Sequence, residues 1–233
     1  MLPTSPSRAG KLAGVEVLLI FGGIAVFVTL AWYFSESAKI KRELKSAPRM
    51  SLRELPESKR ARVVGAAQPL ERTLEAPLTG RTCMYYVVTV EQHHSTGRSS
   101  YWKQIIKEEA GVPFVLDDGT GRAIVDPRSA RVALDVDGKG DSGTFDEPNE
   151  RETAFLQRHG TTGQGWIFNK RLRYREAIIE LGERVAILGE GVREPDPDAP
   201  PADAYRGDQP TRVRMTSSAR FPLLISDSPD TTQ

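Results

Sequence analysis

The feature that most constrains the fold is an uncharged apolar stretch near the N-terminus, VLLIFGGIAVFVTLAWYF at residues 17–34. At about 1.5 Å rise per residue it would form a helix about 27 Å long, close to the roughly 30 Å hydrocarbon core of a bilayer. It is apolar on every face, as a membrane span is. Trp32 and Tyr33 stand at its C-terminal end, where such rings favour the membrane interface. We therefore expect a transmembrane helix over residues 12–34.

The alternative is a cleaved signal peptide, because Ser35 and Ser37 supply small residues before Ala38. The apolar core is longer than is usual for such a peptide, and a Trp-Tyr-Phe run crowds the position where small residues are needed. We expect an anchor that is not cleaved.

The orientation of the anchor follows from the basic residues on its two sides. Two precede the span, Arg8 and Lys11, and five follow it closely, Lys39, Lys41, Arg42, Lys45 and Arg49. The positive-inside rule then predicts a single-pass membrane protein with its C-terminal domain in the cytoplasm.

The composition excludes several classes of partner and site. The 32 basic and 31 acidic side chains nearly cancel, which removes the argument for a nucleic-acid partner. The only cysteine is Cys83, so no internal disulfide can form. A RING domain needs two four-coordinate zinc sites, and one cysteine with three histidines cannot supply them.

From residue 61 onward, short β-rich runs alternate with turn signals. Met84, Tyr86, Val88 and Val90 recur at period two, which predicts a strand over residues 81–92 with 99–109 as its antiparallel partner. About nine such strands with turns roughly every 8 to 12 residues favour a mainly β fold, an antiparallel β-barrel or sandwich-like domain with one or two short helices. Alternating βα units are absent, so a Rossmann-like sheet is not expected.

Composition shifts and prolines divide the chain. In order, we expect a short tail (1–11), the transmembrane helix (12–34), a juxtamembrane helix and connector (35–60), the β-rich domain (61–226) and a C-terminal tail (227–233). Residues 195–210 are rich in Pro and Asp and have little reason to fold. Two apolar runs around Leu181-Gly182-Glu183 predict a hairpin.

The most patterned stretch of the domain is PFVLDDGTGRAIVDP, residues 113–127. A calcium loop would end in a bidentate glutamate, and a phosphate loop would lead from Gly-Lys-Ser/Thr into a helix; neither occurs here. We interpret the stretch as a hairpin whose turn uses Gly119 and Gly121 at positive φ. Asp117 and Asp118 stay candidate contacts for a ligand or partner.

Other candidate groups lack the partners that chemistry needs. His93 and His94 are adjacent, so on a strand they would point to opposite faces. Cys83 lies in an apolar strand, where a thiol behaves as a small hydrophobe. Trp102 and Glu176 remain candidate contact residues, although no opposed carboxylate marks an acid–base pair. We predict no catalytic residue, no metal site and no cofactor.

Several motifs occur in a characteristic order: Ala76-Pro77-Leu78-Thr79-Gly80 before a Cys-x-Tyr-Tyr strand, then Trp102, then residues 112–130, then the Tyr-x-Glu, Gly-Glu and Val-x-x-x-Gly pattern of residues 172–191. This order resembles the GIDE, or "beside-a-membrane", domain of the mitochondrial ubiquitin ligase MULAN and its prokaryotic relatives. The resemblance implies a membrane-apposed β-rich module over most of residues 60–225. MULAN-like ligases also carry a second span and a RING, which we do not expect here, so ligase activity is not implied.

Together these features predict a non-enzymatic module that binds a protein partner or ligand at the membrane surface, anchored in the lipid bilayer through residues 12–34. Two alternatives stay open. One is a membrane-anchored hydrolase or processing enzyme that uses Asp117, Asp118 or Glu176. The other is a scaffold for an envelope or stress complex, for which homo-oligomerisation would be the function.

Overall fold

The computed structural model describes residues 35–142, 149–160, 171–196, 211–218 and 220–233. The predicted transmembrane helix over residues 12–34 lies outside these ranges and stays a prediction. Of the helices within them, none is both long and apolar enough to cross a bilayer. The chain divides into two units, residues 1–39 and 40–233, and the second contains all of the strands named below.

The described residues form twelve strands and four short helical elements, so the prediction of a mainly β fold is confirmed. The strands are β1 (Arg60–Pro69), β2 (Leu74–Glu75), β3 (Thr82–Ser95), β4 (Ser100–Gly111), β5 (Phe114–Asp117), β6 (Arg122–Val125), β7 (Ala130–Val132), β8 (Gly138–Ser142), β9 (Leu172–Glu180), β10 (Arg184–Pro195), β11 (Thr211–Thr216) and β12 (Leu223–Ser226). The helical elements are α2 (Glu36–Ser46), the 3-10 turn η1 (Pro127–Ser129), α3 (Glu150–Arg158) and α5 (Pro229–Thr232).

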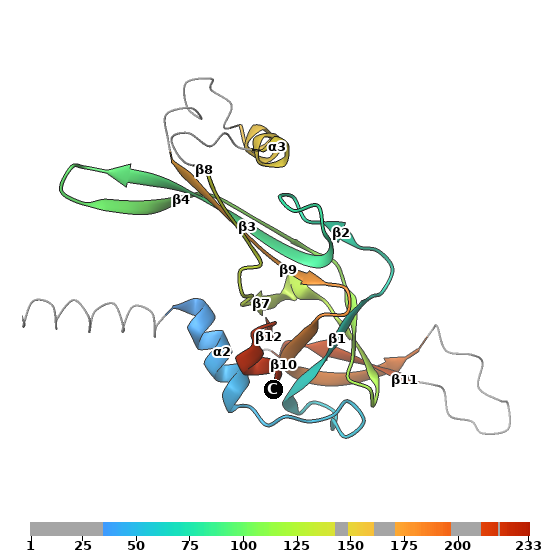
Figure 1. Ribbon diagram of the computed structural model, residues 1–233. Helices are drawn as coiled ribbons and strands as arrows, with labels where there is room; N and C mark the ends of the chain where they lie inside the picture. The colour runs from blue at the N-terminus through green and yellow to red at the C-terminus, as the bar shows by residue number, and fades with distance from the viewer. Residues whose placement is uncertain (1–34, 143–148, 161–170, 197–210, 219) are drawn as a thin grey trace, which may run out of the picture. The chain divides into compact units, whose positions relative to one another are not determined.

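Five strands close into a barrel (Figure 1). β1 pairs antiparallel with β5 and β10, β5 with β6, and β10 with β11, while β6 and β11 run parallel. If the barrel strands are numbered along the chain, their order around the barrel is 1-2-3-5-4, with strands 3 and 5 parallel. This connectivity is that of the OB-fold, a five-stranded Greek-key barrel. The expectation of purely antiparallel pairing is wrong at β6–β11 and at β7–β12.

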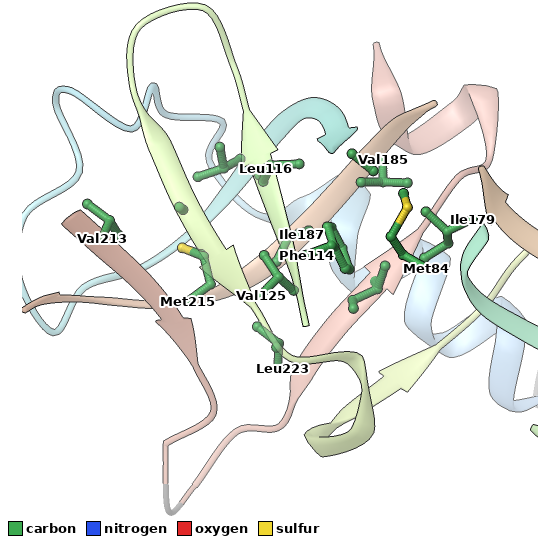
Figure 2. Close-up of a cluster of buried hydrophobic side chains, with 14 of the residues drawn as sticks. Met84, Phe114, Leu116, Val125, Ile179, Val185, Ile187, Val213, Met215 and Leu223 are labelled. Carbon is green, nitrogen blue, oxygen red and sulfur yellow. The ribbon is translucent and has the colours of Figure 1, made fainter. Parts of the chain in front are cut away.

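The barrel interior is filled mostly by aliphatic side chains. Phe114, Leu116, Val125 and Ile187 are fully buried and lie together in Figure 2. Each such side chain contributes roughly 1.5–3 kcal/mol through burial. Gly65 of β1 allows the chain to pass close to β5, because a Cβ there would lie 2.5 Å from the carbonyl oxygen of Asp117.

A second sheet is built from the connections between barrel strands. β2, β3 and β4 lie between β1 and β5 in the chain, and β8 and β9 lie between β6 and β10. In this sheet β3 pairs with β2, β4 and β9, and β9 pairs with β8. The predicted pairing of residues 81–92 with 99–109 is confirmed as β3–β4. Phe155 and Leu156 of α3 pack against this sheet, and Gly160, at φ 69°, follows the end of that helix.

The predicted hairpin around Leu181-Gly182-Glu183 is wrong, because its two strands enter different sheets. β9 pairs with β3 in the second sheet, whereas β10 pairs with β1 in the barrel. The turn between them bonds to β1: Gly182 N–H donates to the carbonyl of Ala67, and Ala67 N–H donates to the carbonyl of Glu183. The β9–β10 segment is therefore the link that joins the sheet to the barrel.

Residues 47–59, which we call the strap, pack against the barrel instead of forming an open connector. Leu52 and Leu55 are buried in the barrel core. Backbone hydrogen bonds fix the path: Met50 N–H donates to Arg62 O, and Ser58 N–H donates to Gly191 O. Gly191 leaves room for the strap, since a Cβ there would lie 2.5 Å from Leu55 Cδ2.

The chain on either side of the barrel is packed in a similar way. Ile40 and Leu44 of α2 are buried against Leu188 and Leu224. At the C-terminal end, where the sequence suggests only a tail, α5 buries Thr231 completely. The hydroxyl of Thr231 donates to the carbonyl of Ser228, which satisfies both groups inside this turn.

If the strap is part of the barrel core, Leu55→Ala should lower the free energy of unfolding by roughly 2–5 kcal/mol, the usual cost of removing a buried leucine. Leu181→Ala is the matched control, since Leu181 is 46% exposed while Leu55 is 4% exposed. We expect the control to change stability by less than about 0.5 kcal/mol. Guanidinium unfolding of the detergent-solubilised full chain measures both. Equal effects of the two substitutions would contradict a packed strap.

Candidate functional site

One concave site of the barrel is a cleft of about 230 Å³ beside β5 and β6. Its lining is Gln68, Pro69, Leu70, Val115, Arg122, Ala123, Ile124, Asp196 and Arg212. These residues come from the end of β1, from β5 and β6, and from the two chain ends that flank the β10–β11 connection. We call this site the barrel cleft.

The barrel cleft has an apolar floor and a charged rim. Val115 and Ile124 stand next to each other across β5 and β6, since they pair in the sheet, and both line the cleft. At the rim, the side chain of Arg122 is 73% exposed and its Nε lies 3.3 Å from Asp117 Oδ2. Such a site can hold a ligand by packing and by charge-assisted hydrogen bonds.

The opposite rim is organised by an ion-pair network. Arg212 Nε lies 2.7 Å from Glu194 Oε1, and Arg214 Nε lies 2.8 Å from Glu194 Oε2. The hydrogen bonds from Arg214 and Arg212 lower the pKa of Glu194. Both arginines therefore have fixed geometry, and Arg212 keeps its position beside the apolar floor. The described lining contains no aromatic side chain on which a nucleobase could stack.

The carboxylate of Asp118, a predicted contact residue, binds backbone amides. Its carboxylate accepts hydrogen bonds from the amides of Leu52 (2.7 Å), Thr120 (2.8 Å) and Gly121 (2.9 Å). Partial burial alone would raise the pKa of Asp118, but these donors together lower it. Because Leu52 belongs to the strap, Asp118 ties the strap to the β5–β6 turn.

The other residues of that turn have backbone tasks too. Asp117 accepts the amide of Gly119 at 2.9 Å, and Gly119 adopts φ 80°. Gly121 differs from our interpretation, because it is not among the residues with positive φ. Its lack of a side chain matters for packing instead, since a Cβ there would lie 3.2 Å from Leu52 Cβ.

Glu176 of β9 is a buried carboxylate that holds a loop. Its side chain is only 1% exposed and accepts the amide of Leu78 at 2.8 Å and the amide of Thr79 at 3.1 Å. The hydroxyl of Thr79 donates to it as well. The Ala76–Gly80 turn is therefore fixed to the sheet by this one carboxylate, which leaves it little capacity to act on a substrate.

Trp102 lies on β4, opposite His93 of β3. The Arg173 guanidinium lies 4.3 Å from the centroid of the indole ring, and the His93 ring meets it edge-on at 5.1 Å. Trp102 is thus half-buried in a ring and cation stack on the second sheet. Asp117 and Asp118 belong to the barrel, whereas Glu176 and Trp102 belong to this sheet, so the four candidates do not form one site.

The described residues contain no assembled metal or nucleophile site. No group of three or more His, Cys, Asp or Glu side chains within the described ranges could hold a metal ion. Burial, with the nearby Glu176 and Glu180 carboxylates, raises the pKa of the Cys83 thiol to about 12. A thiol that stays protonated at neutral pH is a poor nucleophile.

One carboxyl outside the predicted set has an unusual environment. Burial, opposed by a hydrogen bond from the Asp135 amide and reinforced by nearby acidic groups, raises the pKa of Asp227 from 3.8 to about 7. The neighbouring acids are Glu183, Asp135 and Asp137. Burial also raises the pKa of Glu183. These groups lie where the β9–β10 turn meets the C-terminal segment, and they affect stability near neutral pH.

Sequence reasoning missed the barrel cleft, because its lining comes from five separate stretches of the chain. Gln68, Arg122 and Arg212 carry no local motif. The apolar runs at residues 114–116 and 123–125 indicated two of the strands. They did not indicate which face of those strands borders a cleft.

Comparison with known families gives one finding. Residues 85–199 match the family model GIDE, described as E3 Ubiquitin ligase. The match begins within β3 and ends just after β10, so it contains the second sheet, apart from β2 and the start of β3, and barrel strands β5, β6 and β10. No curated protein and no solved structure matches the chain.

We expect Asp118→Ala to lower the free energy of unfolding by about 1–3 kcal/mol, because the Leu52 amide loses its acceptor in a partly buried position. Hydrogen exchange of residues 50–55 should accelerate. Asp117→Ala, which removes an exposed ion pair with Arg122, should cost no more than about 1 kcal/mol. Unchanged exchange in the strap would contradict the tether.

Asp227 gives a pH-dependent prediction. Because its pKa is higher in the folded state than in the unfolded chain, its ionisation lowers stability as the pH rises toward and past about 7. Asp227→Asn removes that charge and keeps an oxygen that can accept the Asp135 amide. The variant should be more stable than the parent at pH values above that pKa, and the difference should vanish in acid, below the pKa of an unfolded aspartate.

The matched control for this experiment is Asp230→Asn, since the hydrogen bond from Lys45 lowers the pKa of Asp230. Removing the Asp230 charge should have the opposite effect on stability, a slight decrease at neutral pH. Thermal unfolding of both variants across the pH range measures the two effects. A benefit of Asp227→Asn that did not change with pH would contradict the assigned pKa.

Proposed function

The chain belongs to the GIDE family through residues 85–199, and on this premise we propose that it is a non-enzymatic, membrane-anchored binding module. In this proposal the barrel cleft holds a segment of a protein partner or a ligand at the membrane surface. The predicted span over residues 12–34 would supply the single-pass anchor. The basic residues that follow it support a cytoplasmic domain in this proposal, through the positive-inside rule.

The position of the cleft on the barrel is the observation that carries the proposal. OB-type barrels bind their ligands on the face of the second and third strands, between the connection of strands 1 and 2 and that of strands 4 and 5. Here the second and third barrel strands are β5 and β6, and both line the cleft. Gln68 and Leu70 lie at the start of the first connection, and Asp196 and Arg212 flank the second.

The description of the family names a ubiquitin ligase, but ligase chemistry is not part of our proposal. A RING needs eight zinc ligands in two four-coordinate sites. The 233 residues contain one cysteine and three histidines, and the histidine rings of His93 and His94 pack on aromatic partners. These residues therefore cannot supply a RING.

The hydrolase alternative from the sequence gains no support from the geometry. Asp118 and Glu176 have their oxygens taken up by backbone amides and by threonine hydroxyls. They also lie on different parts of the fold, the barrel and the second sheet. A general acid–base pair needs two groups that face one substrate.

A photo-crosslinker tests the cleft in native membranes. A benzophenone amino acid at position 122, on the exposed rim, should yield a specific adduct on irradiation, while the same group at position 193, exposed on β10 outside the cleft, should not. With the crosslinker moved to position 68, which also lines the cleft, Arg122→Glu should weaken recovery of the adducted partner by about tenfold, the effect of losing one favourable contact of ~1.4 kcal/mol.

Two results would sink the binding proposal: adducts of equal intensity from both positions, or none from either. An adduct whose mass is twice that of the chain would instead identify a second copy as the partner. Protease treatment of sealed membrane vesicles, before and after permeabilisation, tests the anchor and its orientation separately. Release of the chain by alkaline carbonate would contradict the anchor.

A further inference from the structure

The end of the β3–β4 hairpin, residues 92–104, projects from the second sheet in Figure 1. Every residue from Ser95 to Tyr101 is exposed. Tyr101 is 53% exposed, the largest value among the exposed large hydrophobic side chains of the described residues. We call this segment the hairpin end. Nothing in the barrel cleft or its rim involves it.

The hairpin end is positively charged. It contains Arg98 and Lys103 and has no aspartate or glutamate over its 13 residues, in a chain with 31 acidic side chains. The nearest acidic residue in the chain before it is Glu91, whose carboxylate lies 2.6 Å from Arg173 NH2. That contact neutralises Glu91, so it does not offset the charge of the hairpin end.

Aromatic and imidazole rings lie on both faces of the hairpin end. On one face the rings of His94 and Tyr101 stack at 5.3 Å, with an interplanar angle of 12°. On the other face His93 and Trp102 meet edge to face at 5.1 Å. Cross-strand pairs of this kind stabilise a hairpin. Stabilisation alone does not require a tyrosine that is half exposed, and amphipathic rings of this type favour the membrane–water interface.

The edge of β4 is also built against pairing with another strand. The β3–β4 register shifts at Val90/Glu91, which is a bulge, and Lys103 and Lys107 lie exposed along β4. Bulges and lysines are devices by which edge strands avoid adding a further strand. Both features hinder a partner that would add a β-strand here. An anionic planar surface is not hindered by the bulge, and the lysines attract it.

We propose that the hairpin end is a second membrane contact, which lies on the headgroups of an anionic lipid surface. Arg98 and Lys103 would face lipid phosphates, and the exposed Tyr101 ring would lie at the depth of the headgroups. This inference rests on the membrane anchorage proposed above, but it concerns a different surface from the barrel cleft. Its consequence is that the domain touches the bilayer at two places and is restrained in its orientation.

Hydrogen exchange of the full chain in nanodiscs tests this contact. One set of discs contains phosphatidylcholine alone, and the other contains phosphatidylcholine with phosphatidylglycerol. Exchange of peptides from residues 92–104 should slow by about tenfold in the anionic discs, because each basic residue near such a surface adds attraction. High salt should remove most of the protection, since the attraction is screened.

The double variant Arg98→Glu, Lys103→Glu should lose this protection. The matched control is Arg193→Glu, Arg220→Glu, which reverses two exposed charges outside the hairpin and should keep it. Unchanged exchange in residues 172–180 shows that each variant is folded. Equal exchange in the two kinds of disc, or protection that survives the hairpin double variant, would overturn the contact.

Failure of the anchor can be told apart from failure of the hairpin contact. If the full chain does not enter the discs, the anchorage is refuted, and flotation with vesicles of the same two compositions then tests the hairpin end alone. Binding to anionic vesicles that the hairpin double variant abolishes would support the contact; binding to neither vesicle would overturn it.

Discussion

The pairing of β1 with β10 is the interaction on which the structure depends. β1 is the first barrel strand in the chain, and it must find neighbours on both sides to satisfy its backbone groups. It does so with β5 on one side and with β10, more than a hundred residues later, on the other. Closing the barrel in this way gives each of its five strands a partner on both sides. On β10, Gly189 also lets Leu223 of β12 pack closely, because a Cβ at Gly189 would lie 2.5 Å from Leu223 Cδ1.

Carboxylates that look chemically active in the sequence serve as anchors for backbone in the structure. Asp118 holds the strap, Glu176 holds the Ala76–Gly80 turn, and Asp137 accepts the amide of Ile178. A carboxylate that accepts several amide hydrogen bonds stabilises the fold but is a weak base, because these bonds stabilise its charged form. The glutamate of a Tyr-x-Glu motif can therefore recur in a family for structural reasons alone.

Individual strands and turns could be predicted from the sequence, but the pairing of strands distant in the chain could not. The period-two apolar pattern of residues 81–92 located β3, and the turn at Gly119 followed from its chemistry. Residues 172–194 are an example. Both apolar runs are strands, as predicted, but β9 and β10 enter different sheets, which depends on packing with strands elsewhere in the chain. Leu52 and Leu55 carried a weak signal, two apolar side chains at spacing three between Pro48 and Pro56. For the barrel cleft the sequence indicated only two of the strands, because its lining is assembled from segments distant in the chain.

The family match and the barrel do not have the same limits. Residues 85–199 lack β1 and β11, which supply two of the five barrel strands. Cut out at those limits, β5 would lose β1, β6 would lose β11, and β10 would lose both of its barrel neighbours. Apolar strands with unpaired edges are templates for aggregation. The segment that matches the family model is therefore shorter than the barrel domain. A chain that carries this segment also needs β1 and β11 to complete the barrel.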